Sequence, residues 1–514
     1  MTDNAQQQAV FDFLSRPSSH GGAPVKRIDT HAAAVFLAGK RALKVKRAVR
    51  FPVLDYSTLE KRRAACAAEI EVNRALAPQL YRGVVAITRN AAGRLAIGGQ
   101  NGEPGEPVEY AVEMARFDET RTLDHLTGEI DASCADALGR AVARAHAAAP
   151  VGTGFVETLD EVIAQNDVEL AAAPELFAPD AVARLTRAAR AAYVRLRPLL
   201  IARERAGLVR RCHGDLHLGN IVLIEHEPVL FDAIEFNPKI ATGDVLYDLA
   251  FLLMDLIERD LRPAANIVLN RYLAETRRNE DLDTLAALPL FLSLRAAIRA
   301  KVTAERKERD AAIEQSARDY FALAETLLSP PKPMLVAVGG LSGTGKSLLA
   351  RDLCADLLPE PGAVWLRSDV ERKAQFGVAE TERLPQNAYT REATARVYAA
   401  LAAKAARVLA AGHSAVVDAV FADPAERAQI AQAAGDGSLH GLFLTAPLTT
   451  RIARVGLRTG DASDANADIV RQQERYDLGG MEWTEVDASG SPKETLATAK
   501  LLLPLPPRSG GEGR

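Results

Sequence analysis

Short apolar runs separated by turn residues dominate the chain from residue 25 to residue 118, and this pattern predicts strands. The expected strands are 33–37, 42–46, 84–88, 95–98 and 109–114, with a Gly39-Lys40 turn joining the first two into a hairpin. Residues 57–76 have helical character, with Ser57 or Thr58 as the cap. This order predicts a small antiparallel sheet with one helix packed on it. Residues 1–24 are polar and predict a turn-rich lead-in.

Apolar residues return to helical spacing over about 120–208 and again over 244–328. Residues 209–237 interrupt this spacing and predict a loop between short strands. The segment 329–333, Ser-Pro-Pro-Lys-Pro, predicts a linker, because consecutive prolines cannot continue a helix and stiffen a connector.

Strands and helices alternate after the linker. The strands are expected at 334–339, 363–368, 414–420 and 440–445, and the helices at 346–358, 389–411, 424–434 and 448–458. Such a βαβ series predicts a parallel sheet that helices cover on both faces. Residues 504–514 are rich in Pro and Gly and predict a disordered tail.

A glycine-rich stretch, Gly340-Leu-Ser-Gly-Thr-Gly-Lys-Ser347, follows the first of these strands and leads into the first helix. It has the Gly-x4-Gly-Lys-Ser pattern of phosphate-binding loops, whose backbone N–H groups surround a polyphosphate at a helix N-terminus. Lys346 is expected to reach the β- and γ-phosphates, and Ser347 to ligate Mg²⁺. The residues expected to bind the nucleotide are Gly340, Ser342, Gly343, Thr344, Gly345, Lys346 and Ser347. The motif predicts binding of ATP or GTP and leaves that choice open.

A second chemical motif, His213-Gly-Asp-Leu-His-Leu-Gly-Asn220, is followed by Asp232. Phosphoryl transfer needs a carboxylate that orients the attacking hydroxyl and hard oxygen ligands for Mg²⁺. Asp215 fits the first role, and Asn220 and Asp232 fit the second. His213 and His217 are expected to hydrogen-bond to backbone groups rather than to bind a metal.

This motif resembles the catalytic loop of the aminoglycoside phosphotransferase family, a branch of the protein-kinase-like fold, and the resemblance extends over about residues 25–300. The resemblance implies that Asp248 supports the catalytic loop. It also implies a strand lysine that holds the α- and β-phosphates, either Lys44 or Lys46 with Lys44 preferred. A helix glutamate, Glu69 or else Glu71, would pair with that lysine.

The same resemblance places the segment that contacts adenine at about 109–114. The chain departs from the kinase pattern at one point, because no Gly-x-Gly-x-x-Gly precedes Lys44. The corresponding residues, 29–35, are Asp-Thr-His-Ala-Ala-Ala-Val, so no glycine loop is expected over the phosphates.

Charged residues also follow the strands of the C-terminal part. Arg367 and Asp369 come at the end of the second strand, where ligands bind in doubly wound sheets. Asp369 would either accept a proton from a substrate hydroxyl or cap the helix that follows. Asp418 ends the third strand and would hold the Mg²⁺ water shell.

Arg451, Arg454 and Arg458 share one face of a predicted helix. As lid residues, Arg454 would stabilise charge on the transferring phosphoryl group, and Arg451 and Arg458 would bind the nucleotide; the alternative is a solvated basic face. Residues 334–480 resemble the gluconokinase, shikimate-kinase and zeta-toxin-like group of P-loop kinases. The whole chain resembles bacterial bifunctional aminoglycoside phosphotransferase and AAA-type ATP-binding proteins.

Composition narrows the class of protein. The 514 residues suggest roughly three or four packing units. The net charge of -4 gives no general attraction to nucleic acid or to anionic membranes. The four cysteines are far apart and form no disulfide framework. We expect no signal peptide, no membrane-spanning segment and a cytoplasmic location.

These features together predict a multidomain α/β protein, with a protein-kinase-like α+β fold followed by a P-loop NTPase parallel α/β sandwich. The expected domains are 25–328, with an N-lobe over about 25–118 and a C-lobe over about 119–328, then the linker 329–333 and a P-loop kinase domain over 334–503. We expect an enzyme that uses ATP and Mg²⁺ at two sites to phosphorylate hydroxyls of small molecules, with no nucleic-acid partner. The sequence does not determine the oligomeric state.

Two alternatives remain at this stage. The first domain would be a nucleotide-binding regulator of the second, without transfer chemistry of its own. Alternatively, the P-loop domain would act on a nucleotide-sugar or on an RNA end, and steep salt dependence of binding would indicate the RNA acceptor.

Overall fold

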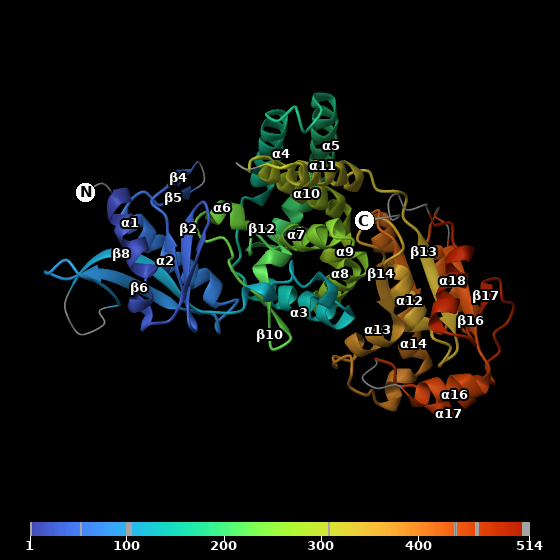
Figure 1. Ribbon diagram of the computed structural model, residues 1–514. Coiled ribbons are helices and arrows are strands. Elements are labelled where there is room, and N and C mark those ends of the chain that lie inside the picture. Colours follow the sequence, from blue (N-terminus) through green and yellow to red (C-terminus); the bar gives the residue numbers. More distant parts are fainter. Residues whose placement is uncertain are drawn as a thin grey trace. The chain divides into compact units, whose positions relative to one another are not determined.

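The structure is a computed structural model that describes residues 3–51, 54–98, 105–306, 309–435, 437, 439–457 and 462–505 (Figure 1). The chain divides into two compact units, residues 1–164 with 197–255 and residues 165–196 with 256–514. The divisions fall inside helices α4 (Phe155–Ala171), α5 (Pro179–Arg205) and α7 (Val245–Glu258). Among the described helices, none combines the length and the hydropathy needed to cross a bilayer.

An antiparallel sheet of six strands forms the first part of unit one. Its order is β1 (Val25–Asp29), β2 (Ala33–Ala38), β3 (Arg41–Lys46), β8 (Glu106–Ala115), β6 (Tyr81–Arg89) and β7 (Leu95–Ile97). Helix α2 (Leu59–Arg74) starts after the cap residue Thr58, whose side chain accepts from Lys61 N, and packs on β6 and β8. A two-residue pair, β4 (Arg50–Phe51) and β5 (Leu54–Asp55), lies between sheet and helix in sequence. The predicted hairpin, helix and later strands are confirmed.

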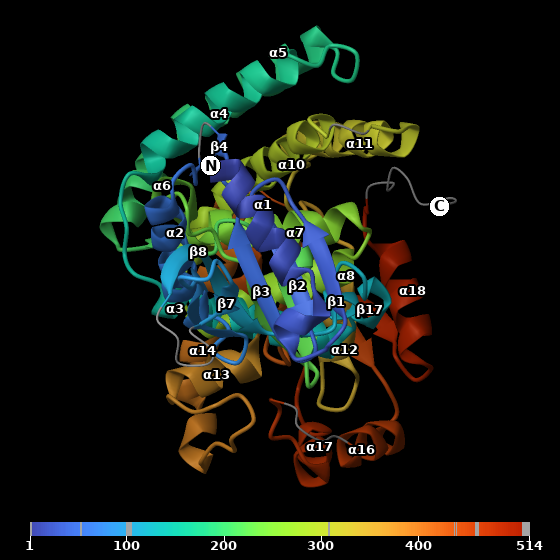
Figure 2. The ribbon, with the colours of Figure 1, turned by 60° about the vertical axis from the view of Figure 1, so that its left-hand side comes forward.

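The prediction of a polar lead-in over residues 1–24 is wrong, because helix α1 (Asp3–Leu14) forms there and lies across the sheet (Figure 2). Val10, Phe11 and Leu14 are buried in a cluster with residues of β2 and β3. Gln7 fixes the helix further, since its Nε2 donates to the carbonyl of Lys46 at 2.9 Å and its Oε1 accepts from the amide of Ala48. Although most of this segment is polar, one face of the helix is apolar, and the sheet buries that face.

Short strands and loops carry the motif from His213 to Asn220 in the rest of unit one. The elements are α3 (Ala132–Ala148), β9 (Val209–Arg211), β10 (Ile221–Ile224), β11 (Glu227–Leu230), α6 (Pro238–Ala241) and β12 (Thr242–Asp244). The β10–β11 hairpin pairs Ile221 with Leu230, and the amide of Phe231 donates to the carbonyl of Asn220 at 3.0 Å. The hairpin therefore brings Asn220 and Asp232, which follows Phe231, to the same end of the ladder.

Unit two begins with a helical part. Its further helices are α8 (Arg262–Thr276), α9 (Asn279–Asp283), α10 (Leu288–Ala304) and α11 (Ala311–Leu327). Helices α10 and α11 pack against each other, and Ser293 donates to the carbonyl of Ala324 across their interface at 2.8 Å. The rings of Phe177 and Phe321 stack with centroids 5.1 Å apart.

A parallel sheet of five strands completes unit two. The strand order is β14 (Val364–Arg367), β15 (Ala415–Asp418), β13 (Leu335–Gly340), β16 (Leu439–Thr445) and β17 (Thr484–Asp487). The helices are α12 (Lys346–Cys354), α13 (Ser368–Gln375), α14 (Arg391–Ala410), α15 (Pro424–Ala433), α16 (Leu448–Gly456), α17 (Ala467–Gln473) and α18 (Pro492–Leu502). Every residue of β13 and β15 is buried, so the predicted cover on both faces is confirmed. Strand β17 and helices α17 and α18 were not predicted, whereas α13 is the helix expected after Asp369.

Strand β14 ends the sheet, and helix α8 covers its free edge. The side chain of Asn270 accepts from the amide of Trp365 at 2.7 Å and donates to the carbonyl of Ala363 at 3.1 Å. Asn266 donates to the same carbonyl at 3.0 Å. These side-chain amides satisfy backbone groups that an edge strand otherwise leaves open, and β14 leads directly to Arg367 and the candidate site residue Asp369.

Candidate active sites

Two lysines of β3 meet one buried glutamate of α2. Lys44 Nζ lies 2.9 Å from Glu69 Oε1, and Lys46 Nζ contacts Glu69 Oε2. This geometry follows from the strand, since residues two apart share a face. Glu69 is fully buried, so the paired cations compensate the cost of removing its charge from water. Glu71, the other candidate, is exposed.

Lys44 and Lys46 have different second partners. Lys44 Nζ lies 2.5 Å from Asp232 Oδ1, whereas Lys46 contacts Glu235. Burial opposes the charged form of Lys44, but Asp232, Glu69 and Glu235 outweigh it and raise its pKa well above the ordinary value. Because only Lys44 joins the helix glutamate to the candidate metal ligand, the geometry favours Lys44 as the lysine of this site.

Lys46 lies in a buried polar group that sequence reasoning missed. Glu235 accepts a hydrogen bond of 2.7 Å from the hydroxyl of Tyr56 in addition to its contact with Lys46. Lys46 and Glu235 are both at least nine-tenths buried. This arrangement gives Lys46 a structural role between α2 and the segment after the catalytic loop.

The motif from His213 to Asn220 is a loop whose backbone groups are hydrogen-bonded by side chains of α7. The amide of Gly214 donates to Asp248 Oδ1 at 2.8 Å, and the amide of Leu218 donates to Asp255 Oδ2 at 2.9 Å. The supporting role expected for Asp248 agrees with this contact. Asp255 was missed, although its place seven residues after Asp248 on one helix puts both on the same face.

The two histidines of the motif bond within the loop. His213 is buried, and its Nε2 lies 2.9 Å from the carbonyl of Phe231, which is the backbone contact expected. His217 Nδ1 accepts from the amide of Gly219 at 3.1 Å, so a neutral ring carries its proton on Nε2. That Nε2 lies 3.4 Å from Asp215 Oδ2. His217 therefore helps to orient the candidate base.

Asp215, Asn220 and Asp232 lie close together. Asn220 Nδ2 donates to Asp215 Oδ2 at 3.1 Å and to the carbonyl of Asp215 at 2.9 Å. Asp232 has the left-handed backbone conformation, with φ of 60°, which aims its carboxylate back toward Lys44. Burial raises the pKa of Asp232, but Lys44 outweighs this effect and lowers it, while the charge of Asp215 opposes the lowering. Asp215 and Asp232 line one cavity, and a pair of carboxylates there fits a cation.

A cavity of about 480 Å³ opens beside these groups. Lys44, Asp215 and Asp232 line it together with Met114 and Phe117. Met114 belongs to the segment 109–114 expected to contact adenine, and the lining continues past the end of β8. The charged groups that line the cavity have both signs, and they are paired: Lys46 contacts Glu235, and Arg116 lies 3.6 Å from Glu119.

The glycine-rich loop has the shape of a phosphate cradle. Gly343 has φ of 86°, and a Cβ there would lie 2.5 Å from the carbonyl oxygen of Arg451, so only glycine fits. Gly345, also in the left-handed region, precedes the first residue of α12. Lys346 Nζ donates to the carbonyl of Leu341 at 3.2 Å, which folds the lysine back over its own loop.

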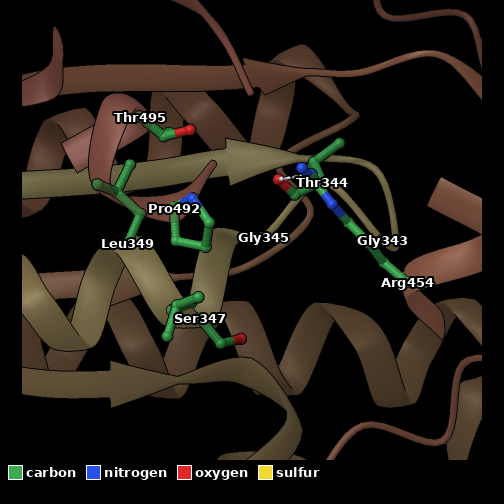
Figure 3. A pocket seen from close by; sticks show the side chains of 9 residues that line it. Gly343, Thr344, Gly345, Ser347, Leu349, Arg454, Pro492 and Thr495 are labelled. Carbon is green, nitrogen blue, oxygen red and sulfur yellow. Dashed lines mark hydrogen bonds between the residues drawn. The ribbon is translucent and has the colours of Figure 1, made fainter. Parts of the chain in front are cut away.

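A pocket of about 270 Å³ adjoins this loop (Figure 3). Thr344, Ser347, Arg454 and Pro492 line it, and Arg454 extends from α16 toward Thr344. The guanidinium donates to the carbonyls of Ala488 and Gly490, each at 2.8 Å. Pro492 was missed because it belongs to α18, which was not predicted.

Helix α17 also contacts the glycine-rich loop. The amide of Ser342 donates to Gln473 Oε1 at 2.7 Å, and Gln473 is buried. The next residue, Glu474, pairs with Arg451. Arg451 is only 2% exposed, which excludes the solvated basic face for this residue. Arg458 lies outside the described residues.

Asp369 and Asp418 meet at the carboxyl ends of β14 and β15. Burial raises the pKa of Asp369, the charge of Asp418 raises it further, and Lys346 and Arg367 act in the opposite direction. Helix α13 begins at Ser368 with Arg367 as its N-cap residue, so Asp369 lies inside the first turn. The alternative that Asp369 caps this helix is therefore wrong.

Comparisons with known proteins agree with this division of sites. A sequence model described as the Phosphotransferase enzyme family matches residues 39–288, and one described as an AAA domain matches residues 335–477. The uncharacterized protein Rv2004c of Mycobacterium tuberculosis is 30% identical over 493 residues, covering 92% of this chain and 94% of the relative. This chain belongs to the same family.

This chain joins a phosphotransferase domain to an AAA domain, as the resemblances seen in the sequence predicted. Among solved structures, a choline/ethanolamine kinase family protein from Mesorhizobium loti is similar over 63% of this chain and 95% of its own, with 17% identity and a TM-score of 0.38. A gluconokinase from Sinorhizobium meliloti is similar over 33% of this chain and 91% of its own, with 20% identity and a TM-score of 0.25.

The domain types of the family support enzymatic phosphoryl transfer in general. Families of this kind generally use ATP with a divalent metal ion. The predicted α/β multidomain fold, with a kinase-like first region and a P-loop region built on a parallel sheet, is confirmed.

Proposed function

We propose that this protein is an ATP-dependent phosphotransferase with two nucleotide sites, each of which transfers the γ-phosphoryl group to a hydroxyl of a small molecule. The observation that carries the proposal is the contact of Lys44 with both Glu69 and Asp232 beside Asp215. This set combines a phosphate-binding cation, a metal ligand and a base in one cavity, which phosphoryl transfer requires.

In the first site Asp215 orients the acceptor hydroxyl and receives its proton as the phosphoryl group arrives. His217 and Asn220 hold the Asp215 carboxylate in place. Asn220 directs its side-chain amino group to Asp215, so its side-chain oxygen, Oδ1, remains for a metal. This oxygen and the carboxylate of Asp232 would hold Mg²⁺. Mg²⁺ held by these two residues would supply positive charge that offsets the charge of the phosphates. Lys44 would then leave its ion pair with Asp232 and bind the phosphates, while its ion pair with Glu69 remains.

In the second site Lys346 and Ser347 would hold the triphosphate and Mg²⁺, with Asp418 on the metal's water shell. Asp369 would accept the acceptor's proton, and its raised pKa brings its basicity closer to that of a working general base. Arg454 was expected to stabilise the transferring group. Its bonds to Ala488 and Gly490 favour a second role, in which it and the ring of Pro492 hold the nucleotide base.

A panel of sugars, polyols, amino alcohols and aminoglycosides, incubated with the purified full chain and ATP, tests the proposal. Asp215→Asn is expected to remove one set of phosphorylated products and Lys346→Ala another, while the exposed Glu71→Gln variant retains both. Absence of any product across the panel contradicts the proposal. RNA ends are tested in parallel, and flat salt dependence of binding excludes them.

A second candidate function rests on the Lys44–Asp232 ion pair. This pair occupies both groups that would receive Mg²⁺·ATP, as expected for a domain that senses nucleotide without transferring phosphate. If Asp215→Ala leaves every product unchanged and alters only the apparent ATP affinity of the P-loop site, the first domain is a regulator.

A further inference from the structure

Three buried side chains with metal-binding atoms meet behind the catalytic loop. His146 lies in the last turn of α3, Cys212 directly precedes the loop, and Asp248 lies in the first turn of α7. One ligand atom of each lies within 4.8 Å of those of the other two. All three residues are at most 5% exposed. We propose that His146, Cys212 and Asp248 bind a divalent transition metal ion of the zinc type.

The donor set selects the metal. An imidazole, a thiolate and a carboxylate together suit zinc and its neighbours, whereas Mg²⁺ prefers an all-oxygen site. This site is therefore separate in chemistry from the two proposed Mg²⁺·ATP sites. Tetrahedral zinc with bonds of about 2.0 Å to nitrogen and oxygen separates those two ligands by roughly 3.3 Å. His146 Nε2 and Asp248 Oδ2 are 3.1 Å apart, close to that separation.

Asp248 can bind a metal without releasing the catalytic loop. Its Oδ1 accepts from the amide of Gly214 at 2.8 Å, whereas its Oδ2 faces His146. An ion between Oδ2 and His146 Nε2 displaces the proton shared there to solvent, leaving a neutral imidazole as the ligand, and keeps the bond from Gly214 intact. Cys212 Sγ, now 3.7 Å from the carbonyl of Gly243, loses its proton to solvent when it binds the ion.

An adjoining cavity gives the ion a route and a fourth ligand. Its volume is about 950 Å³, and His146, Cys212 and Asp248 all line it. Water in this cavity can complete a tetrahedron whose other three corners the protein supplies. The bound ion would tie α3 and α7 to Cys212, the residue directly before the loop, so its expected effect is a more rigid loop around Asp215.

Cobalt titration tests the site directly in the full-length, reduced and chelator-treated protein. Co²⁺ bound to a thiolate gives a charge-transfer absorption band, so the wild-type protein is expected to show this band with one equivalent per chain and to lose it when Zn²⁺ is added. Cys212→Ser is expected to abolish the band and to weaken Zn²⁺ binding by more than about tenfold. Cys66→Ser, at another buried cysteine of the same unit, and Cys134→Ser retain both.

Thermal unfolding supplies a readout that is independent of activity. One equivalent of Zn²⁺ is expected to raise the unfolding temperature of the wild-type protein and of Cys66→Ser, but not that of Cys212→Ser or His146→Asn. No thiolate-to-cobalt band in the wild-type protein overturns the proposal, and that measurement depends on no variant. A band that survives in Cys212→Ser and disappears in Cys134→Ser overturns it as well.

Discussion

The backbone amide of Ser342, in the glycine-rich loop, donates its hydrogen bond to the side chain of Gln473, 131 residues later in the chain. In the proposed nucleotide complex, a phosphate in this loop would use the same amide. Gln473 would then compete with the ligand, and the ion pair of Arg451 with Glu474 would hold α17 in the competing position.

Removing this competitor is expected to strengthen nucleotide binding. Gln473→Ala frees the Ser342 amide, and the loss of one hydrogen bond of about 1 kcal/mol corresponds to roughly fivefold tighter binding. Calorimetry in a Lys44→Ala background, which removes the first site, measures the effect at the second. The neighbouring, exposed Gln472→Ala serves as the matched control and leaves the affinity unchanged. Weaker binding in Gln473→Ala would show that the side chain assists the phosphate instead.

The two lysines of β3 are expected to respond differently to substitution. Lys44→Ala removes the cation that would bind phosphate, so first-site products fall by about a hundredfold or more. Lys46→Ala leaves the buried Glu235 without its cation, and breaking a buried pair in this way costs about 3–5 kcal/mol. Activity assays and thermal unfolding separate the two outcomes, with exposed Lys40→Ala as the control. If Lys46→Ala has the unfolding temperature of the wild-type protein but forms no first-site product, and Lys44→Ala remains active, Lys46 is the ATP lysine.

The parts of both sites that were predicted from sequence are those whose residues lie within a few positions of one another in the chain. The glycine-rich loop and the segment from His213 to Asn220 carry their chemistry within a few residues, so the residue pattern alone identifies them. Likewise, the alternation along β3 was enough to show that Lys44 and Lys46 face the same way.

The parts that were missed depend on contacts between distant residues. Nothing near Gln473 distinguishes it from Gln472, and Asn270 contacts Trp365 across 95 residues of sequence. Strand β17, Thr-Glu-Val-Asp, has one apolar residue and gives no apolar run. Helix α1 has all its large apolar residues within residues 10–14, which is too short a stretch to show a helical period, and the sheet buries Val10, Phe11 and Leu14.

Asp369 is expected to lower the stability of the folded protein and to be required for activity at the second site. A carboxyl whose pKa is raised on folding binds its proton more tightly in the folded state, so its contribution to stability falls as pH rises from 3.8 through the folded pKa. At any pH well above 3.8, including neutral pH, the carboxyl of Asp369 therefore destabilises the folded state. Asp369→Asn is expected to raise the unfolding temperature at pH 7 and to lower second-site products by about a hundredfold. A lower unfolding temperature would contradict the origin given for the raised pKa.

His413 is expected to make the free energy of unfolding of unit two decrease as the pH falls below 6.5. Burial lowers the pKa of His413 from 6.5 to about 4, with Nε2 2.8 Å from the carbonyl of Gly362. The unfolded chain binds the additional proton, so this stability is fully present above pH 6.5 and is lost as pH falls toward 4. The total is roughly 3 kcal/mol at about 1.4 kcal/mol per pKa unit. Urea unfolding between pH 4 and 7 measures it, and His413→Gln is expected to flatten the slope. An unchanged slope assigns the acid sensitivity to other groups.

Asn270 is expected to act on the second site without touching nucleotide or acceptor. Asn270→Ala leaves the amide of Trp365 and a bond to Ala363 unmade, which costs about 1–3 kcal/mol. Because β14 runs from these residues to Asp369, a loosened strand displaces the candidate base. We expect KM for the second-site acceptor to rise and kcat to fall, with first-site products unchanged. Asn270→Gln restores part of the activity if the side-chain amide is what matters, and exposed Asn279→Ala is the control. Equal losses at both sites would instead indicate general unfolding, which the melting curve of each variant reveals.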